Sequence, residues 1–313
     1  MMKKTKINIP LSVPRNKEIE YKNNWKKATW GTGNLMMFAG DQKVEHLNDD
    51  FVGKGIPKEV ADPEHYFRIA NKAKIGVFAT QLGLLSKYGR DYPNINYLVK
   101  VNSKANILKK TTRDPFSGIW IQLKEILEFK KQSKANIVGV GYTVYLGSWY
   151  ESEMFKEAAH LICEAHKAGL IVVIWMYPRG VSVINEKDVH LIAGAAGVAT
   201  CLGADFVKLN YPNGDKAKSA EKFKEVVNAA GDRTGVICVG GSKKDPRKFL
   251  KSIYDQKHIS KTRGVAIGRN IYQNTLEDSI RMANAISSIA IFDYSLDDAF
   301  KILKDEKELN LNQ

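Results

Sequence analysis

The chain has 313 residues, 44% of them hydrophobic and 26% charged, which is typical of a globular protein with a full core. Its three cysteines, Cys163, Cys201 and Cys238, form no CxxC pair, which excludes a zinc ribbon and a disulfide-stapled fold. The net charge of +14 comes from lysines spread along the chain, many of them beside acids. We therefore expect anionic substrates and no nucleic-acid partner.

The sequence contains no apolar run of about 18 residues, so we expect no membrane partner. Its basic N-terminus lacks the apolar core of a signal peptide. These two observations predict a cytoplasmic protein.

Short apolar runs alternate with longer helical patterns along the chain. The runs are rich in β-branched residues and are bounded by Gly, Asp or Asn, as expected for strands buried on both faces. Eight such runs occur, at residues 34–40, 74–80, 97–102, 136–144, 170–177, 205–210, 235–241 and 264–268.

Helical patterns separate most of these runs. They cover residues 61–73, with Asp62 as a candidate N-cap before Pro63, and 152–169, 186–203, 215–231, 245–256 and 275–290. Between the second, third and fourth strands we expect irregular stretches in place of clean helices. The alternation predicts an α/β protein, a (β/α)8 TIM barrel over 34–292. Residues 1–33 form an N-terminal extension packed on it, and 293–313 a charged C-terminal helix. A doubly wound open sheet is the alternative, but no GxGxxG turn follows the first strand.

Polar and aromatic residues gather at the carboxyl ends of the predicted strands, where a TIM barrel places its chemistry. The amino ends of the same strands carry nothing comparable. The candidates at the carboxyl ends are Asp41, Gln42, His46, Lys100, Tyr142, Tyr145, Trp175, Tyr177, Arg179, Lys208, Asn210, Gly240, Gly241, Ser242, Gly268 and Arg269.

Lys208 interrupts the apolar strand of GADFVKLNY. Because side chains alternate along a strand, Phe206, Lys208 and Asn210 share one face. A lysine inside a packed barrel is desolvated, which lowers its pKa, and a second cation such as Lys100 would lower it further. The free amine can then attack a ketone and form a Schiff base. The alternative is a structural lysine in a buried ion pair with a carboxylate.

The last two strands predict a phosphate site. Gly240, Gly241 and Gly268 would let backbone N–H groups approach an anion, and Arg269 adds a planar donor. Plain tight loops are the alternative. Tyr177 is the candidate acid or base, with a pKa that we expect nearby cations to lower. No HxH or HExxH spacing occurs, so we expect no metal.

Seven segments in chain order resemble the archaeal-type class I fructose-1,6-bisphosphate aldolases and bacterial relatives of the same Schiff-base family. They are GDQKVEH, YLVKVN, VGVGYTVYLGS, WMYPRG, GADFVK, VGG and IGRN, and the resemblance runs from about residue 35 to 285.

The resemblance implies a TIM barrel whose Lys208 forms the Schiff base with a ketone phosphate, with Tyr177 as proton donor and Trp175 in contact with the substrate. By position, the motifs of the family match Arg179, Asp41, Gln42, His46 and Asp50. The phosphate site of the family matches Gly240, Gly241, Gly268 and Arg269. No cofactor is implied, and the family suggests a homo-oligomer such as a decamer. Two positions depart from it. Val239 replaces a serine, so one phosphate contact would come from a backbone N–H or Ser242, and Gln42 replaces a histidine.

We consider three functions for this sequence, two that use the Schiff base and one that does not. The first is reversible cleavage of fructose 1,6-bisphosphate to glycerone phosphate and glyceraldehyde 3-phosphate. The second keeps the imine and changes the aldehyde, giving a deoxy-ketohexose phosphate or a 2-amino-3,7-dideoxy-heptulosonate for aromatic precursors. The third is a phosphate- or nucleic-acid-binding barrel without catalysis.

Overall fold

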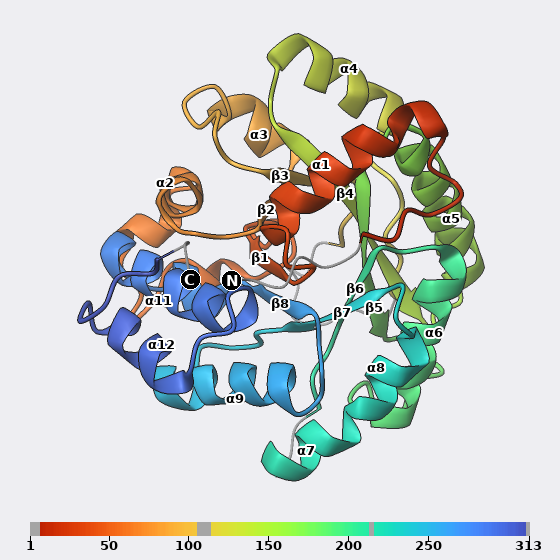
Figure 1. Ribbon diagram of the computed structural model, residues 1–313. Helices are drawn as coiled ribbons and strands as arrows, with labels where there is room; N and C mark the ends of the chain where they lie inside the picture. Colours follow the sequence, from red (N-terminus) through yellow and green to blue (C-terminus); the bar gives the residue numbers. More distant parts are fainter. Residues whose placement is uncertain (1–6, 105–113, 213–215, 311–313) are drawn as a thin grey trace.

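The computed structural model describes residues 7–104, 114–212 and 216–310. Its strands are parallel and pair in chain order, and the first also pairs with the last, so the sheet closes into an eight-stranded barrel (Figure 1). They are β1 (Leu35–Ala39), β2 (Val77–Gln81), β3 (Tyr97–Lys100), β4 (Ile137–Leu146), β5 (Ile171–Pro178), β6 (Phe206–Leu209), β7 (Gly235–Val239) and β8 (Gly264–Ile267). The predicted TIM barrel is confirmed, and the open sheet is wrong.

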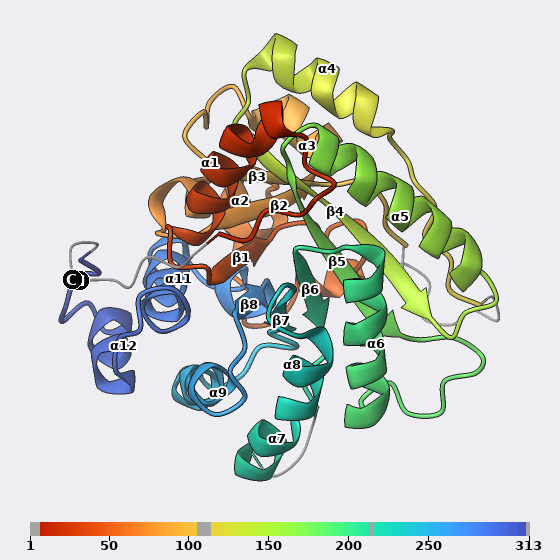
Figure 2. The same cartoon turned by 45° about the vertical axis from the view of Figure 1, so that its right-hand side comes forward.

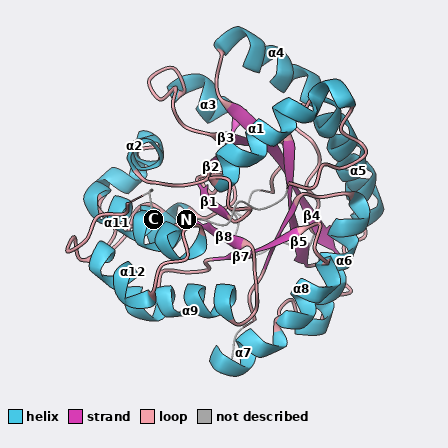
Figure 3. Ribbon diagram, in the orientation of Figure 1, coloured by secondary structure: helices cyan, strands magenta, loops and turns pink. Residues whose placement is uncertain are grey.

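Helices enclose this barrel on all sides (Figure 3). They are α1 (Glu18–Thr29), α2 (Glu64–Lys72), α3 (Leu82–Tyr88), α4 (Leu123–Ser133), α5 (Glu151–Lys167), α6 (Val189–Leu202), α7 (Lys216–Lys222), α8 (Lys224–Ala230), α9 (Pro246–His258), α10 (Arg269–Tyr272), α11 (Leu276–Ala290) and α12 (Leu296–Leu303). Short 3₁₀ turns, η1 (Arg15–Lys17), η2 (Asn48–Asp50) and η3 (Lys58–Ala61), complete the structure. None of the helices in the described ranges is long and apolar enough to cross a membrane.

Three helix predictions need correction. The irregular stretches expected between the second and fourth strands contain the helices α3 and α4. The start of α4 is fixed by Glu125, whose carboxylate accepts the backbone N–H of Gln122 at 2.8 Å. The pattern over 215–231 forms two short helices, α7 and α8, where we expected one. The N-cap of α2 is Pro63, one residue after the predicted Asp62, whose carboxylate accepts the Glu64 N–H at 3.0 Å.

The N-terminal segment covers the amino end of the barrel. Tyr21 and Trp25 of α1 belong to the same buried cluster as the inward-facing side chains of the strands. The Trp25 ring stacks on Phe206 of β6 with 5.0 Å between ring centroids. Figure 1 shows α1 lying across this end. The expected packing of the extension on the barrel is thus observed for residues 7–33.

A buried carboxylate fastens this segment. Asp205, directly before β6, accepts the Tyr21 hydroxyl at 2.5 Å and the Val172 N–H at 2.7 Å. Its second oxygen also lies 3.2 Å from the Nε2 atom of His166 on α5. Because all of these side chains are buried, the hydrogen bonds are needed to offset the desolvation of the carboxylate.

The C-terminal helix is shorter than predicted. It runs from Leu296 to Leu303 as α12, and residues 304–310 are not helical. Helices α9, α11 and α12 lie together beside β8 and β1 (Figure 2).

Replacing Asp205 with alanine will destabilise the fold by about 3–5 kcal/mol, because three buried groups lose their acceptor. Tyr21→Phe removes a single hydrogen bond and will cost about 2 kcal/mol. Urea unfolding followed by tryptophan fluorescence measures both. Equal losses for the two variants would contradict the central role given to the carboxylate.

Candidate active site

The polar residues predicted at the carboxyl ends of the strands surround a cavity of about 190 Å³. It lies at the mouth of the barrel, opposite the end covered by α1. Its lining comprises Gln42, Glu45, His46, Tyr145, Tyr177, Arg179, Lys208, Asn210, Val239, Gly240, Gly241, Ala266, Gly268 and Arg269. Most of the predicted site residues are therefore in one place.

The Lys208 side chain points into the barrel beside Trp175. The two residues are aligned in the β5–β6 pair, and the ammonium nitrogen lies 5.0 Å from the centroid of the indole ring. In the described part of the chain no hydrogen bond or ion pair reaches this nitrogen. Burial lowers the pKa of Lys208 to about 8, and Lys100 acts in the same direction while Asp41 and Glu45 oppose it.

Lys100 has the opposite environment. Its buried ammonium donates to Glu45 Oε1 at 2.9 Å and to Asp41 Oδ2 at 3.3 Å. Burial alone would lower the pKa of Lys100, but the two carboxylates outweigh it and raise the pKa. It also lies 4.5 Å from the centroid of the Trp175 ring. The buried ion pair considered for Lys208 is therefore made by Lys100, which leaves Lys208 as the free amine.

Asp41 supports this arrangement from behind the cavity. It is fully buried and does not line the cavity. Burial acts to raise its pKa, but Lys100 and then Lys208 outweigh this and lower it, so the group is a carboxylate. Gln81 of β2 donates to its backbone carbonyl at 2.8 Å, which fixes the start of the loop after β1.

Tyr177 lines the cavity, as predicted, but the expected lowering of its pKa is wrong. Burial first, and then the carboxylates Glu45 and Asp41, raise the pKa of Tyr177 well above its ordinary value, against a smaller effect of Arg179. The side chain is therefore a neutral phenol that can donate a proton. Tyr142, on the neighbouring strand β4, faces outward and donates to Glu157 of α5 at 2.7 Å, so it takes no part in the cavity.

The loops after β7 and β8 form another wall of the cavity. Gly241 has a φ of +69°, which favours glycine. A Cβ on Gly268 would lie 2.1 Å from Oε1 of Gln42, so this position has room only for glycine while Gln42 keeps its place. Asn270 joins the two loops, since its amide donates to the carbonyls of Gly240 and Ser242 at 3.3 and 3.1 Å. Ser242 itself is exposed and does not line the cavity.

Asp50 holds two of the residues that line the cavity. Its Oδ2 atom lies 2.5 Å from Nδ1 of His46 and accepts from Nη1 of Arg269 at 3.4 Å. Gln273 fixes the Asp50 backbone by donating to its carbonyl at 2.8 Å. Asp50 does not line the cavity, so it positions the imidazole and the guanidinium beside the glycine loops.

Sequence reasoning missed Glu45 as a site residue. A turn after β1, in which the N–H of Glu45 bonds to the Gln42 carbonyl at 3.0 Å, returns its side chain over the mouth. There it binds Lys100 and accepts the hydroxyl of Ser103. The signal was present, because Glu45 lies within the DQKVEH segment that carries the resemblance.

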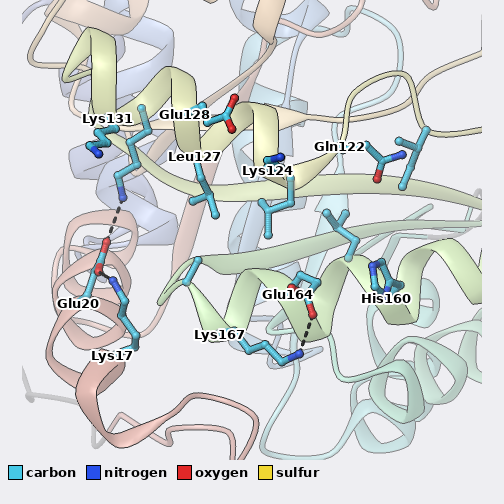
Figure 4. Close-up of a pocket in the computed structure, with 15 residues that line it drawn as sticks. Lys17, Glu20, Gln122, Lys124, Leu127, Glu128, Lys131, His160, Glu164 and Lys167 are labelled. Carbon is cyan, nitrogen blue, oxygen red and sulfur yellow. Dashed lines mark hydrogen bonds and ion pairs between the residues drawn. The ribbon is translucent and has the colours of Figure 1, made fainter.

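A larger cavity, of about 960 Å³, lies between α4 and α5 (Figure 4) and shares no lining residue with the cavity at the barrel mouth. Its charged residues include ion pairs between helix side chains, such as the exposed pair of Lys167 with Glu164 at 2.7 Å and the partly exposed pair of Lys130 with Glu20 at 3.2 Å. It gathers no buried group with a reactive protonation state, so the smaller cavity is the candidate active site.

Residues 35–274 match the sequence-family model that describes the DeoC/LacD family aldolases. A protein of Methanocaldococcus jannaschii named fructose-bisphosphate aldolase/6-deoxy-5-ketofructose 1-phosphate synthase is 55% identical over 307 residues, which are 98% of this chain and 97% of that protein. A solved fructose-bisphosphate aldolase from Slackia heliotrinireducens DSM 20476 has a TM-score of 0.95 at 47% identity and covers 98% of this chain and 97% of its own.

A third similar protein is an archaeal fructose-1,6-bisphosphate aldolase solved with its catalytic Lys covalently bound to the carbinolamine intermediate of the substrate. It has a TM-score of 0.73 at 29% identity and covers 87% of this chain and 99% of its own. The chain belongs to the DeoC/LacD aldolase family. The predicted resemblance is confirmed, and with it the class of enzyme, an aldehyde-lyase of the Schiff-base type.

The amine of Lys208 will react as a free base near neutral pH. Cyanate carbamylates only unprotonated amines, so the rate at which the Lys208 peptide is modified, measured by mass spectrometry, should rise with pH around a midpoint of about 8. An unperturbed lysine has its midpoint at about 10.4.

Lys100→Met removes the neighbouring cation and leaves two carboxylates facing Lys208, so the midpoint will move up by about 1–2 pH units. Circular dichroism controls for folding. A midpoint that falls or stays constant in this variant would show that Lys100 does not influence the amine.

Proposed function

We propose that the chain is a class I, metal-independent fructose-bisphosphate aldolase. It would cleave fructose 1,6-bisphosphate reversibly to glycerone phosphate and glyceraldehyde 3-phosphate. The observation that carries this proposal is the unpaired amine of Lys208, buried at the barrel mouth with a pKa of about 8. A buried lysine without a counter-ion costs stability, and its availability as a nucleophile accounts for its presence.

In the proposed reaction the Lys208 amine adds to the C2 carbonyl carbon of the open-chain sugar and forms a carbinolamine. Loss of water gives an iminium ion, which accepts the electron pair of the C3–C4 bond. As that bond breaks, the C4 hydroxyl loses its proton and C4 leaves as the aldehyde. The resulting enamine takes a proton at C3, and water hydrolyses the iminium, releasing glycerone phosphate and restoring the amine.

Tyr177 is the proposed proton-transfer residue. In the condensation direction its neutral phenol donates a proton to the aldehyde oxygen as the new bond forms. Glu45 and Asp41 carry one more negative charge than Lys100 can neutralise, and this excess favours the positively charged iminium on the neighbouring Lys208.

The loops after β7 and β8 are the proposed site for the phosphate of the ketone. Gly240, Gly241 and Gly268 expose their backbone at the cavity, and Arg269 is held beside them by Asp50. Backbone N–H groups and a planar guanidinium suit the oxygens of a phosphate. Asn210, on the strand of Lys208, is a proposed contact for a substrate hydroxyl.

A second candidate function is synthesis of 6-deoxy-5-ketofructose 1-phosphate, supported by the double name of the relative that is 55% identical. Dividing that product between C3 and C4 gives glycerone phosphate and methylglyoxal, so it uses the same imine and a different aldehyde. The aromatic-precursor reaction considered from the sequence would share the imine as well.

Lys208→Met will reduce cleavage of fructose 1,6-bisphosphate by at least about 10³-fold, because no imine can form. Wild-type protein treated with glycerone phosphate and borohydride should carry the adduct on the Lys208 peptide. Lys167→Met, on the outer surface of α5, is the matched control and should retain full activity. Substantial cleavage by Lys208→Met, or an adduct on another lysine, would refute the assignment.

Tyr177→Phe will lower kcat for condensation by about 10²–10⁴-fold, since it removes the proton donor. The ring remains in place, so the borohydride adduct on Lys208 should still form in this variant.

The choice of aldehyde separates the two candidate functions. If the chain is mainly a fructose-bisphosphate aldolase, its kcat/KM in condensation with glycerone phosphate will be higher for glyceraldehyde 3-phosphate than for methylglyoxal. The reverse order would favour synthesis of 6-deoxy-5-ketofructose 1-phosphate.

A further inference from the structure

The cavity presents one arginine on each side of Lys208. Arg269 follows β8 and lies beside the glycine loops, whereas Arg179 follows β5 and lies near Tyr177 and Tyr145. If a ketone phosphate occupies the β7–β8 side, the rest of the sugar chain extends past Lys208 towards β4 and β5. The far end of the substrate then meets Arg179.

The two guanidinium groups differ in how many of their N–H donors are already bonded to a carboxylate. Arg269 makes one long contact with Asp50, at 3.4 Å. Arg179 donates from Nε to one oxygen of Glu186 at 2.9 Å and from Nη2 to the other at 3.0 Å. This bidentate pair occupies the Nε–Nη2 edge, one of the two edges with which a guanidinium can bind a phosphate.

The backbone fixes one partner of this pair more firmly than the other. The N–H of Arg179 bonds to the Leu146 carbonyl of β4 at 2.8 Å, which holds the guanidinium at the cavity. Glu186 lies in the loop before α6, and both side chains are 40% exposed. The carboxylate can therefore leave without disturbing buried structure.

We propose that Glu186 is a specificity-determining residue that competes with the phosphate of the aldehyde for Arg179. This inference rests on the proposed aldolase function and concerns its aldehyde. A phosphorylated aldehyde must displace Glu186 before it can bind Arg179, whereas an uncharged aldehyde needs no such displacement. The pair lowers the preference for glyceraldehyde 3-phosphate and so leaves the site open to uncharged aldehydes.

The strengths of the two interactions permit this exchange. An exposed ion pair shifts an equilibrium by at most about fivefold. A charge-assisted phosphate contact is worth about 10- to 100-fold. The phosphate therefore displaces Glu186 when it is present, and Glu186 weakens its binding by a modest factor.

The test uses two aldehydes that differ only in the phosphate, glyceraldehyde 3-phosphate and glyceraldehyde, each condensed with saturating glycerone phosphate. Glu186→Gln should lower KM for the phosphorylated aldehyde by up to about fivefold, with glyceraldehyde unchanged within about twofold. Arg179→Gln should lower kcat/KM for the phosphorylated aldehyde by about 10- to 100-fold more than it lowers kcat/KM for glyceraldehyde. Glu164→Gln, from an exposed pair on α5, is the charge-matched control and should change neither.

The double variant Arg179→Gln/Glu186→Gln separates competition at Arg179 from a general effect of charge. If Glu186 acts through Arg179, the double variant will match Arg179→Gln alone. A further gain from Glu186→Gln in the Arg179→Gln background would overturn the inference. So would equal changes for both aldehydes, or a raised KM for glyceraldehyde 3-phosphate in Glu186→Gln.

The Lys208 adduct distinguishes this failure from failure of the proposed function. If wild-type protein forms the adduct with glycerone phosphate but the variants show no phosphate-selective change, the inference alone is refuted. If no adduct forms on Lys208, the aldolase proposal fails and takes this inference with it.

Discussion

The ion pairs of Lys100 determine the chemistry of the site. Two lysines face the inside of one barrel and share the ring of Trp175, but the carboxylates lie beside only one of them. The reason is the strand order. Lys100 is aligned with Gln81 of β2, next to the loop after β1 that carries Asp41 and Glu45, whereas the partners of Lys208 on β5 and β7 are Trp175 and Ile237. Lys100 therefore keeps its proton, and Lys208 loses its proton more easily.

The two ends of the barrel have different tasks. At the amino end, α1 fills the interior with Tyr21 and Trp25, and Asp205 is fully satisfied by hydrogen bonds. At the carboxyl end, the Trp175 indole nitrogen and one oxygen of Asp41 are buried without a hydrogen-bond partner in the described residues. Leaving buried polar atoms unpaired costs stability, and a closed, well-packed amino end is what makes that cost tolerable. The amino end stabilises the fold, and the carboxyl end is kept reactive.

The sequence predicted the strands well because each is a continuous apolar run, and Lys208 stood out as the exception within one of them. It failed where tertiary contacts decide the outcome. Helix α4 follows an irregular approach containing Asp114, Pro115 and Gly118, which hid its start. Glu45 was overlooked because only the folded turn brings it back over the mouth. The pKa of Tyr177 was predicted in the wrong direction, because neighbouring cations were counted while burial and two carboxylates were not.

The same rule of charge pairing operates at the rim of the cavity. The two arginines there each have a carboxylate partner, Asp50 of η2 for Arg269 and Glu186 before α6 for Arg179, and the geometry of the two pairs differs. A single contact at 3.4 Å leaves most donors of Arg269 available, in keeping with the phosphate site proposed there. Two contacts at about 3 Å occupy one edge of Arg179. The pairing of charges thus differs at two depths: inside the barrel it raises the pKa of Lys100 and leaves Lys208 without a carboxylate partner, and at the rim it occupies more of the Arg179 guanidinium than of the Arg269 guanidinium.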